Sequence, residues 1–595
     1  MNSLRIGRFA ALVLSAAAVS GAEENPVSAE RAYVNGQVFT SDRAGTVTQA
    51  IAIRGGRIVY VGSDDGVKAY IGPETTKVDL KGRTLLPGLI DAHMHPLGAG
   101  SQLLKCSLNY ESLTVVEFQK RVQTCVDQAP PGGPDDWLEI VGWFQESMRP
   151  SGVKTSRATL DALKTTRPIL VRSTFGHTVL ANTRALALAK MTKATPDPIG
   201  GKIWRDASGE PTGLLEDSAF TVFDSLVPKP TVEQDVQAAS AALKAMNQQG
   251  VTSFLDAWAR PDAMTAFSIL RKTGRLTARA HFAPPIEPEE NKEISAAVDR
   301  IVSFRKSFDE GPIGTEPGIT IRNCKLFLDG VISAPAFTGA MLEPYRRNAG
   351  TAQHPRWVAG TSRGPDVYFS PRDLSKILIE LGRAGIDPHL HADGDGAVRA
   401  ALDAIESLRK TLPDSDIRPA IAHDEIVALE DFPRFKALDV TAVLSFQWGK
   451  PAGDTLGVTD YFGPQRMKLL EPYGRLAQAG ARISYGSDWP VDALDEWFAL
   501  KVGVTRTNSP DVPDEYRGRL GDDPGLSRDQ VLRAITINAA YQLHQDDQIG
   551  SLEVGKLADL IVLDRNFTKI PAEEIARIKV VETVVGGKVV YANEH

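Results

Sequence analysis

Short runs in which apolar and polar residues alternate occupy both ends of the chain. Near the N-terminus, "RAYVNGQVFT", "QAIAIRGGRIVYVG" and "TKVDLKGRTLLPG" have the pattern of strands with one buried face. Asn35-Gly36 and Gly55-Gly56 separate alternating runs, which is typical of β-hairpins. The runs "GSLEVGKLADLIVLD" and "VVETVVGGKVVYAN" repeat the pattern near the C-terminus. We therefore expect a small β-sandwich domain built from both termini, over residues 23–84 and 548–595.

Between these ends, apolar strand-like runs alternate with amphipathic helical segments such as "PRDLSKILIELGRAG". The runs are "RPILVRST", "VTSFLDA", "TIRNCKLFLDG", "IDPHLHADG", "IRPAIAHDE", "VTAVLSFQ" and "ARISYGSDWP". With a strand at Leu85 to Ile90 there are eight candidates. This alternation predicts an α/β fold, a (β/α)8 TIM barrel over residues 85–547. The chemistry of such a barrel lies at the C-terminal ends of its strands, where these runs carry polar residues.

The first residues have the features of a secretory signal. Arg5 and Arg8 precede the apolar "FAALVLSAAAVSGA", and the small residues Ser20 and Ala22 stand where a signal peptidase reads. The apolar part is shorter than the roughly 20 residues of a spanning helix. We expect a signal peptide over residues 1–22, a periplasmic or secreted mature chain and no membrane span in it. An amphipathic start of a cytosolic protein is the alternative.

The composition excludes several other classes of protein. Hydrophobic residues make up 42% and charged residues 24% of the 595, as in globular proteins. A net charge of -7 without a long Lys/Arg run argues against a nucleic-acid partner or an anionic lipid surface. Three cysteines do not make a disulfide scaffold. Cys106 and Cys125 could pair in an oxidising compartment, and two buried free thiols are the alternative.

Metal-ligand residue types gather at the predicted strand ends. His93 and His95 are two apart, so in a strand both side chains face the barrel axis and can reach one ion. A lone histidine near a strand end is more often structural, but several in barrel order predict a metal site. The set consists of His93, His95, Lys325, His391, His423 and Asp488.

These residues stand in recognisable motifs: "PGLIDAHMHP", "KLFLDG", "LHADGDGA", "AIAHDEIV", "YGSDWPV" and the closing "GSLEVGKLADLIVLD". "GWFQES" and "GHTVLANTRAL" belong to the same pattern. The combination resembles the metal-dependent amidohydrolase superfamily and, within it, amidohydrolase family 3, the YtcJ-like group that includes N-substituted formamide deformylases. The resemblance covers nearly all of the mature chain.

The resemblance implies one or two divalent metal ions. His93, His95 and Asp488 would hold one, and His391 and His423 a second. Lys325 would bridge them as a carbamate formed from CO₂, because an ammonium group cannot ligate a cation. A mononuclear site, with Lys325 in a salt bridge to Asp329 or another carboxylate, is the alternative. Zinc suits imidazole and carboxylate ligands, but manganese, cobalt or iron could fit.

The same resemblance implies hydrolysis of a non-peptide C-N bond, most simply an amide. A metal lowers the pKa of a bound water from about 15.7 towards 7, which gives a hydroxide nucleophile at neutral pH. Asp488 would take the proton and deliver it to the leaving nitrogen. His177 would contact the carbonyl oxygen or orient the substrate, with a structural histidine as the alternative.

The chain departs from the family pattern at a few positions. Ala422 precedes His423 where many relatives have Glu, Asp393 stands where an apolar residue is common, and the segment after Gly330 lacks a usual Ser-Arg-Thr pattern. We expect these positions to line or support the pocket, and His389 to be structural. Aromatic residues near strand ends could line the pocket or belong to the core: Trp143, Phe144, Phe175, Trp258, Trp448 and Trp489.

The expected partner is thus a small-molecule amide, and the oligomeric state is left open. An ester, lactone or cyclic amide is the alternative substrate, because the same nucleophile attacks all these carbonyls. A non-catalytic binding or regulatory relative is a second alternative, since fold does not fix function. A purely structural zinc site is disfavoured because such sites are usually closed four-ligand sets rich in cysteine.

Overall fold

The structure is a computed structural model that describes residues 28–145, 148–150, 153–174, 176, 178–198, 201–333, 336–351 and 353–593. The expected signal peptide, residues 1–22, lies outside the described residues, as do His177 and Phe175. Among the residues that are described, no helix combines the length and the apolar character needed to cross a membrane.

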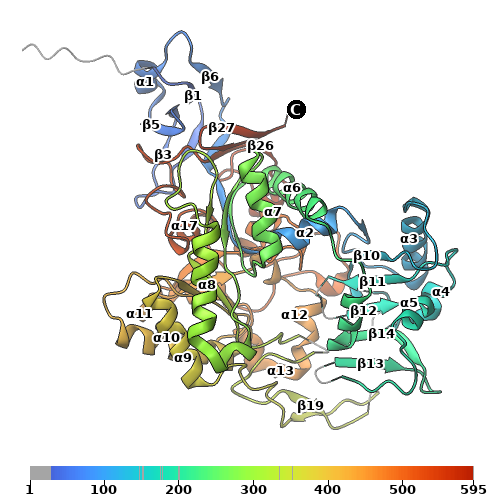
Figure 1. Cartoon of the computed structure of the whole chain (residues 1–595). Helices are drawn as coiled ribbons and strands as arrows, with labels where there is room; N and C mark the ends of the chain where they lie inside the picture. The colour runs from blue at the N-terminus through green and yellow to red at the C-terminus, as the bar shows by residue number, and fades with distance from the viewer. Residues whose placement is uncertain are drawn as a thin grey trace, which may run out of the picture.

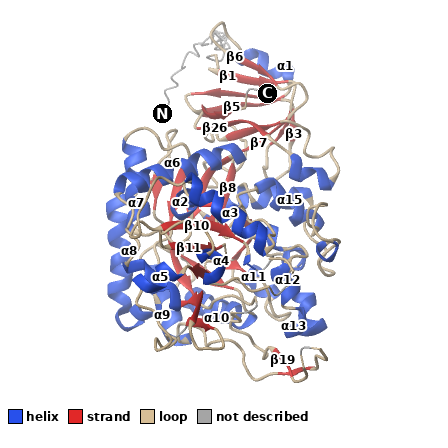
Figure 2. Ribbon diagram, turned by 90° about the vertical axis from the view of Figure 1, so that its right-hand side faces the viewer, coloured by secondary structure: helices blue, strands red, loops and turns tan. Residues whose placement is uncertain are grey.

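Strands from the two ends of the chain lie together at one pole of the molecule (Figures 1 and 2). One sheet has the order β27-β26-β25-β7-β2-β3. Its strands are β2 (Gln37–Phe39), β3 (Val47–Thr48), β7 (Thr84–Pro87), β25 (Leu560–Leu563), β26 (Val580–Val585) and β27 (Lys588–Ala592). A second sheet has the order β5-β4-β1-β6 and consists of β1 (Arg31–Val34), β4 (Ala50–Arg54), β5 (Arg57–Gly62) and β6 (Thr76–Asp79). Tyr33, Leu85 and Leu560 belong to one buried cluster, so the two sheets share a core.

The hairpin predictions have different outcomes. β4 and β5 pair antiparallel around Gly55-Gly56, and β26 and β27 do so around Gly586-Gly587, which confirms both Gly-Gly turns. The Asn35-Gly36 prediction is wrong, because β1 and β2 lie in different sheets. Asn35 has φ of 56°, so this pair turns the chain from one sheet to the other instead of folding it back on itself.

The middle of the chain forms two parallel sheets. The first contains β8 (Leu89–Met94), β15 (Val251–Asp256), β16 (Arg279–Phe282) and β17 (Ile319–Thr320). The second contains β18 (Asn323–Phe327), β21 (Asp387–Ala392), β22 (Ala420–His423), β23 (Thr441–Leu444) and β24 (Arg482–Tyr485). The sheets meet at both edges: Asp488 N donates to His93 O at 2.8 Å, and Lys325 N donates to Pro284 O at 3.1 Å. The C-terminal ends of the strands therefore gather on one side.

Helices connect these strands and cover them from outside (Figure 2). They include α6 (Val232–Gln249), α7 (Pro261–Lys272), α8 (Ile294–Phe308), α9 (Pro371–Arg383) and α10 (Asp395–Thr411). In α9, Leu374, Ile377, Leu378 and Leu381 are buried at the spacing of one helix face, and the Ser370 hydroxyl caps the first turn. The helices thus follow from the amphipathic pattern of the sequence.

The strand predictions contain one wrong assignment and one omission. "RPILVRST" contains β11 (Ile169–Ser173), which lies in a separate sheet and not beside β8. The missing parallel strand is β16, a run of four residues that ends at Phe282. In addition, the single strand expected from Leu85 to Ile90 is divided at Gly88 into β7 and β8. The run "TIRNCKLFLDG" is also divided, into β17 and β18, so among the described residues the two parallel sheets contain nine strands and not the eight expected.

The segment between β8 and β15, here called the inserted region, forms a separate layer at the side of the parallel sheets (Figure 1). Its sheet has the order β13-β14-β12-β11-β10-β9. Its other strands are β9 (Cys106–Ser107), β10 (Leu138–Trp143), β12 (Thr178–Ala181), β13 (Gly201–Arg205) and β14 (Pro211–Asp217). A disulfide joins Cys106 to Cys125 of α3 (Val115–Gln128), which decides the open question of their pairing, and Cys324 is a buried free thiol.

Candidate active site

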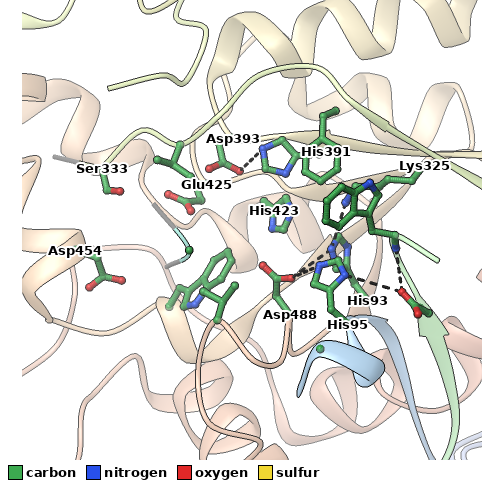
Figure 3. Close-up of a pocket in the computed structure, with 18 of the residues that line it drawn as sticks. His93, His95, Lys325, Ser333, His391, Asp393, His423, Glu425, Asp454 and Asp488 are labelled. Atoms are coloured by element: carbon green, nitrogen blue, oxygen red, sulfur yellow. Dashed lines mark hydrogen bonds and ion pairs between the residues drawn. The ribbon is translucent and has the colours of Figure 1, made fainter. Parts of the chain in front are cut away.

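A cavity of about 740 Å³ lies at the C-terminal ends of the parallel strands. The structure brings all of the sequence-predicted metal residues into its lining: His93, His95, Lys325, His391, His423 and Asp488. Figure 3 shows them facing one another from β8, β18, β21, β22 and the loop after β24. His177 lies outside the described residues, although Gly176, which precedes it, lines the cavity.

One group of ligand atoms centres on Asp488. Its Oδ1 lies 3.0 Å from His95 Nε2 and 3.5 Å from His93 Nε2. This oxygen is buried and has no hydrogen-bond partner among the described residues. Two imidazoles and a carboxylate that converge in this way match the donor set of a divalent transition metal.

A second group lies beside the first and centres on His391. Its ring centroid is 4.5 Å from that of His423, and its Nε2 is 3.6 Å from Asp393 Oδ1. One ligand atom from each of these three buried residues lies within 4.8 Å of the others. The same spacing holds for His93, His423 and Asp488, so His423 stands between the two groups.

Lys325 is buried between the histidines. Its Nζ is 3.3 Å from His93 Nε2 and 4.6 Å from the ring centroid of Phe327. Burial lowers the pKa of Lys325 to about 7, against the opposing effect of Asp488 and other carboxylates. Within the described part of the chain, no carboxylate lies close enough for an ion pair with Lys325, and the alternative salt bridge to Asp329 is not formed.

Burial also decides the charge of the imidazoles. It is the main cause that lowers the pKa of His93 and of His423 well below the usual value, with the charge of Lys325 adding to the effect. Neutral imidazoles keep a nitrogen lone pair for a metal. Together with the unpartnered Asp488 oxygen, this makes the residues present a good fit for a bound cation.

Two buried side chains outside the cavity lining, those of His389 and Asp91, form hydrogen-bond contacts with His93. His389 Nε2 lies 2.8 Å from His93 Nδ1 and therefore fixes the ring. Asp91 Oδ1 accepts the backbone N–H groups of His93 and of Ser487, each at 3.1 Å. A β-carbon at Gly486 would lie 2.4 Å from His93 Cβ, so only glycine permits this close approach of the two segments.

The backbone is unusual at two predicted ligands. His423 has φ of 83° and Asp488 has φ of 55°, both in the left-handed region that residues other than glycine rarely adopt. Such conformations cost about 1–3 kcal/mol each and collect at functional sites. Here they turn the side chains at the ends of β22 and β24 into the cavity.

Aromatic and apolar side chains form much of the cavity wall. Trp448 stacks on His423 with ring centroids 5.6 Å apart, and Trp258 meets Phe327 edge-on at 6.1 Å. The other described candidates do not line the cavity. Trp143 packs on Phe118 in the inserted region, Trp489 belongs to the main core, and Phe144 is half-buried elsewhere.

Most of the departures from the family pattern contribute residues to the cavity lining, and one lies in the core. Val331, Ile332, Ser333 and Asp393 line the cavity, whereas Ala422 is buried among other strand residues. The sequence did not single out Asp256, Glu425 or Glu471, which also line the cavity. Burial raises the pKa of Asp256 to about 6 and that of Glu471 to about 8. Asp256 is the last residue but one of the run "VTSFLDA", and this position near a strand end was a usable signal, whereas no sequence signal pointed to Glu471.

A sequence model of the amidohydrolase family matches residues 76–591. The chain belongs to the amidohydrolase family. This confirms the resemblance, and membership in this family supports a hydrolase. Among similar proteins, LONG AFTER FAR-RED 3 of Arabidopsis thaliana is 28% identical over 95% of this amidohydrolase-family chain and 92% of its own length.

Two bacterial relatives have nearly the same extent. The putative amidohydrolase YtcJ of Bacillus subtilis is 26% identical over 93% of this chain and 98% of its own. The N-substituted formamide deformylase of Arthrobacter pascens is 26% identical over 94% and 97%. A crystal structure of an uncharacterised metal-dependent hydrolase from Pyrococcus horikoshii is similar with a TM-score of 0.69 at 22% identity, covering 91% of this chain and 99% of that one. That likeness shows a shared α/β fold.

Proposed function

We propose that the protein is a metal-dependent hydrolase that cleaves a non-peptide C-N bond, most simply an amide, in a small molecule. The observation that carries the proposal is the convergence of His93 Nε2, His95 Nε2 and Asp488 Oδ1 inside a cavity. Family membership and the N-substituted formamide deformylase among its relatives support the choice of bond.

His93, His95 and Asp488 would hold one divalent ion, with zinc as the default. A bound metal lowers the pKa of a water and polarises a carbonyl. In the overall reaction an oxygen of water bonds to the carbonyl carbon, the C-N bond breaks, and a proton reaches the leaving nitrogen. Asp488 would move that proton, which is supported by the position of its carboxylate in the cavity lining beside His93 and His95.

Lys325 and His177 have supporting roles in this proposal. Lys325 would carry a carbamate, since it is buried beside His93 and no carboxylate pairs with it among the described residues. The carbamate would supply an anionic oxygen between the two ligand groups. His177 would contact the substrate carbonyl, which the position of Gly176 in the cavity lining supports.

The substrate would be a bulky or aromatic amide. The cavity volume of about 740 Å³ lies in the range of small-molecule sites. Trp258, Phe327 and Trp448 offer aromatic faces, and Arg260 covers the Trp258 ring at 4.2 Å. Flat apolar groups pack well against such surfaces.

We also propose that the two parallel sheets form one (β/α)8 barrel and the terminal sheets one β-sandwich. The hydrogen bonds at both edges support the first, and the core shared by the sheets supports the second. The Cys106–Cys125 disulfide supports an oxidising compartment, either periplasmic or extracellular. Cell fractionation with detection of the protein tests the location.

The proposed function is tested by amine release from a substrate panel. The purified protein is reconstituted with zinc and bicarbonate and given N-formyl, N-acyl aromatic and cyclic amides, lactones and esters. We expect turnover of one amide group and its loss in Asp488→Asn. Circular dichroism shows whether the variant is folded, and elemental analysis gives the number of metal ions that it binds. Turnover of esters or lactones alone, or equal turnover by the variant, would contradict the proposal.

A further inference from the structure

Asp393 is a carboxylate that the fold directs into the cavity beside two histidines. It follows β21, two residues after His391, and its side chain is buried, with 3% of its surface exposed. Its Oδ1 has no hydrogen-bond partner among the described residues, although it is out of contact with water. A buried, unpartnered carboxylate oxygen is costly unless something positive meets it.

The neighbouring Asp329 differs in this respect. Its Oδ2 accepts the N–H groups of Ala340 at 2.8 Å and Gly394 at 2.9 Å, and its Oδ1 accepts the N–H of Asp393 at 3.1 Å. These bonds fix the turn after β21 and occupy the Asp329 oxygens. They leave the Asp393 side chain as the carboxylate with a free oxygen on this side of His391.

The His391 ring lies between a backbone carbonyl and the Asp393 carboxylate. Its Nε2 lies 3.0 Å from the carbonyl oxygen of Gly330, a hydrogen-bond distance, but 3.6 Å from Asp393 Oδ1. A hydrogen bond of this kind to a backbone carbonyl sets the orientation of the ring. A ligating histidine commonly donates its other N–H in this way.

We infer that Asp393 is the third protein ligand of a second divalent cation, which His391 and His423 also hold. The ligand atoms of these residues lie within 4.8 Å of one another (Figure 3). The first ion does not require His423, because His93 and His95 both approach Asp488 Oδ1. The inference rests on the proposed metal-dependent function. It adds to the second ion a protein ligand that does not depend on a carbamate at Lys325.

The chemistry of the set favours a particular class of cation. Two imidazoles and one carboxylate suit zinc and its first-row neighbours better than the oxygen-seeking magnesium or calcium. Because Asp393 contributes its own negative charge, the second ion would have three protein ligands even if Lys325 is unmodified. We therefore expect two zinc ions per chain in the presence and in the absence of bicarbonate.

Zinc content tests the inference without any substrate, so its failure is distinct from a failure of the proposed hydrolysis. The metal-free protein is dialysed against a series of buffered zinc concentrations. The zinc bound per chain is then measured by inductively coupled plasma mass spectrometry. We expect two ions in the wild type and one in Asp393→Asn, with the dissociation constant of the second ion raised by about 100-fold or more.

Glu425→Gln is the matched control. Glu425 lines the same cavity but belongs to neither ligand group, so this variant should bind two ions. Circular dichroism and thermal unfolding of the metal-free proteins check that each variant is folded. One zinc in the wild type, or two ions bound by Asp393→Asn with unchanged affinity, would overturn the inference.

A second variant keeps the test decisive if Asp393→Asn does not fold. In Asp393→Cys a thiolate replaces the carboxylate, and thiolates ligate zinc and its neighbours well. With cobalt in place of zinc, we expect a thiolate-to-cobalt charge-transfer absorption that the wild type lacks. A folded Asp393→Cys protein that holds two cobalt ions without this absorption would show that residue 393 is not a ligand.

Discussion

Asp91 Oδ1 accepts the backbone N–H of Ser487 at 3.1 Å, which joins the first parallel strand to the loop after the last. The same oxygen accepts the N–H of His93 at 3.1 Å. One fully buried carboxylate thus fixes the segments that carry His93 and Asp488. The distance between these two predicted ligands depends on a residue that does not line the cavity.

Asp91→Ala should therefore disturb the first metal site without removing a ligand. Two buried N–H groups lose their acceptor, at a cost of about 1–3 kcal/mol each. We expect zinc affinity of this site to fall about 10- to 100-fold, as for other residues that orient ligands. Equilibrium dialysis measures the affinity, and Asp91→Asn, which keeps one acceptor oxygen, should recover part of it. Unchanged zinc binding in Asp91→Ala would assign Asp91 to stability alone.

The proposed carbamate on Lys325 can be detected directly. Protein reconstituted with carbon-13 bicarbonate should show one carbamate carbon signal by nuclear magnetic resonance. The signal should be absent from Lys325→Met, which keeps the length and apolar character of the buried side chain. If wild type and variant give the same spectrum, Lys325 is an ordinary amine in the site.

A buried ion pair ties the terminal sheets to the parallel strands. Arg279 of β16 donates to Asp559, with Nε–Oδ2 at 2.7 Å and Nη2–Oδ1 at 3.0 Å, and both side chains are buried. Removing one partner of such a pair costs about 3–5 kcal/mol, because the other charge is left without compensation. Asp559→Ala should lower the midpoint of urea unfolding accordingly. The double variant Arg279→Met/Asp559→Leu should recover much of the loss, and a double variant as unstable as the single one would contradict this account.

The disulfide should stabilise the inserted region and not the cavity. Cys125 lies 19 positions after Cys106 in sequence, and a disulfide that closes a loop of that length stabilises the folded state by about 3 kcal/mol. Cys106→Ser/Cys125→Ser should be cleaved faster by a protease between residues 105 and 230, with zinc binding retained. Cys324→Ala, which changes a free thiol, is the control. Cleavage at the same rate in both variants would mean that the disulfide adds little.

The sequence predicted which histidines and carboxylate meet at the cavity, because strand geometry constrains their positions. His93 and His95 are two apart, and His391, His423 and Asp488 end other apolar runs, so parallel pairing brings them to one side. Asp393 was marked only as a departure from the family pattern. Its closeness to His391 depends on the turn that Asp329 fixes, which no local pattern encodes.

The sheets were harder to predict because the pairing of strands depends on residues that are distant in sequence. The run around β11 is as apolar as a strand of the main parallel sheets, but it pairs with β10 in parallel and with β12 antiparallel, both in the inserted region. β16 has only four residues, so its apolar period is too short to distinguish it from a connection. Likewise, Asn35-Gly36 permits a left-handed turn but does not decide which strands pair.

The terminal sheet also affects how the chain folds during synthesis. β7 leaves the ribosome early, yet its partner β25 and the adjoining β26 lie more than 470 residues later, as the pairing of Ile561 with Leu86 shows. Until those strands are made, the edge of β7 that faces β25 has no native partner, and unpaired edges invite association with other chains. In the nascent protein, β7 therefore stays unprotected until β25 has been synthesised. A chain that is terminated before β25 is expected to aggregate or be degraded.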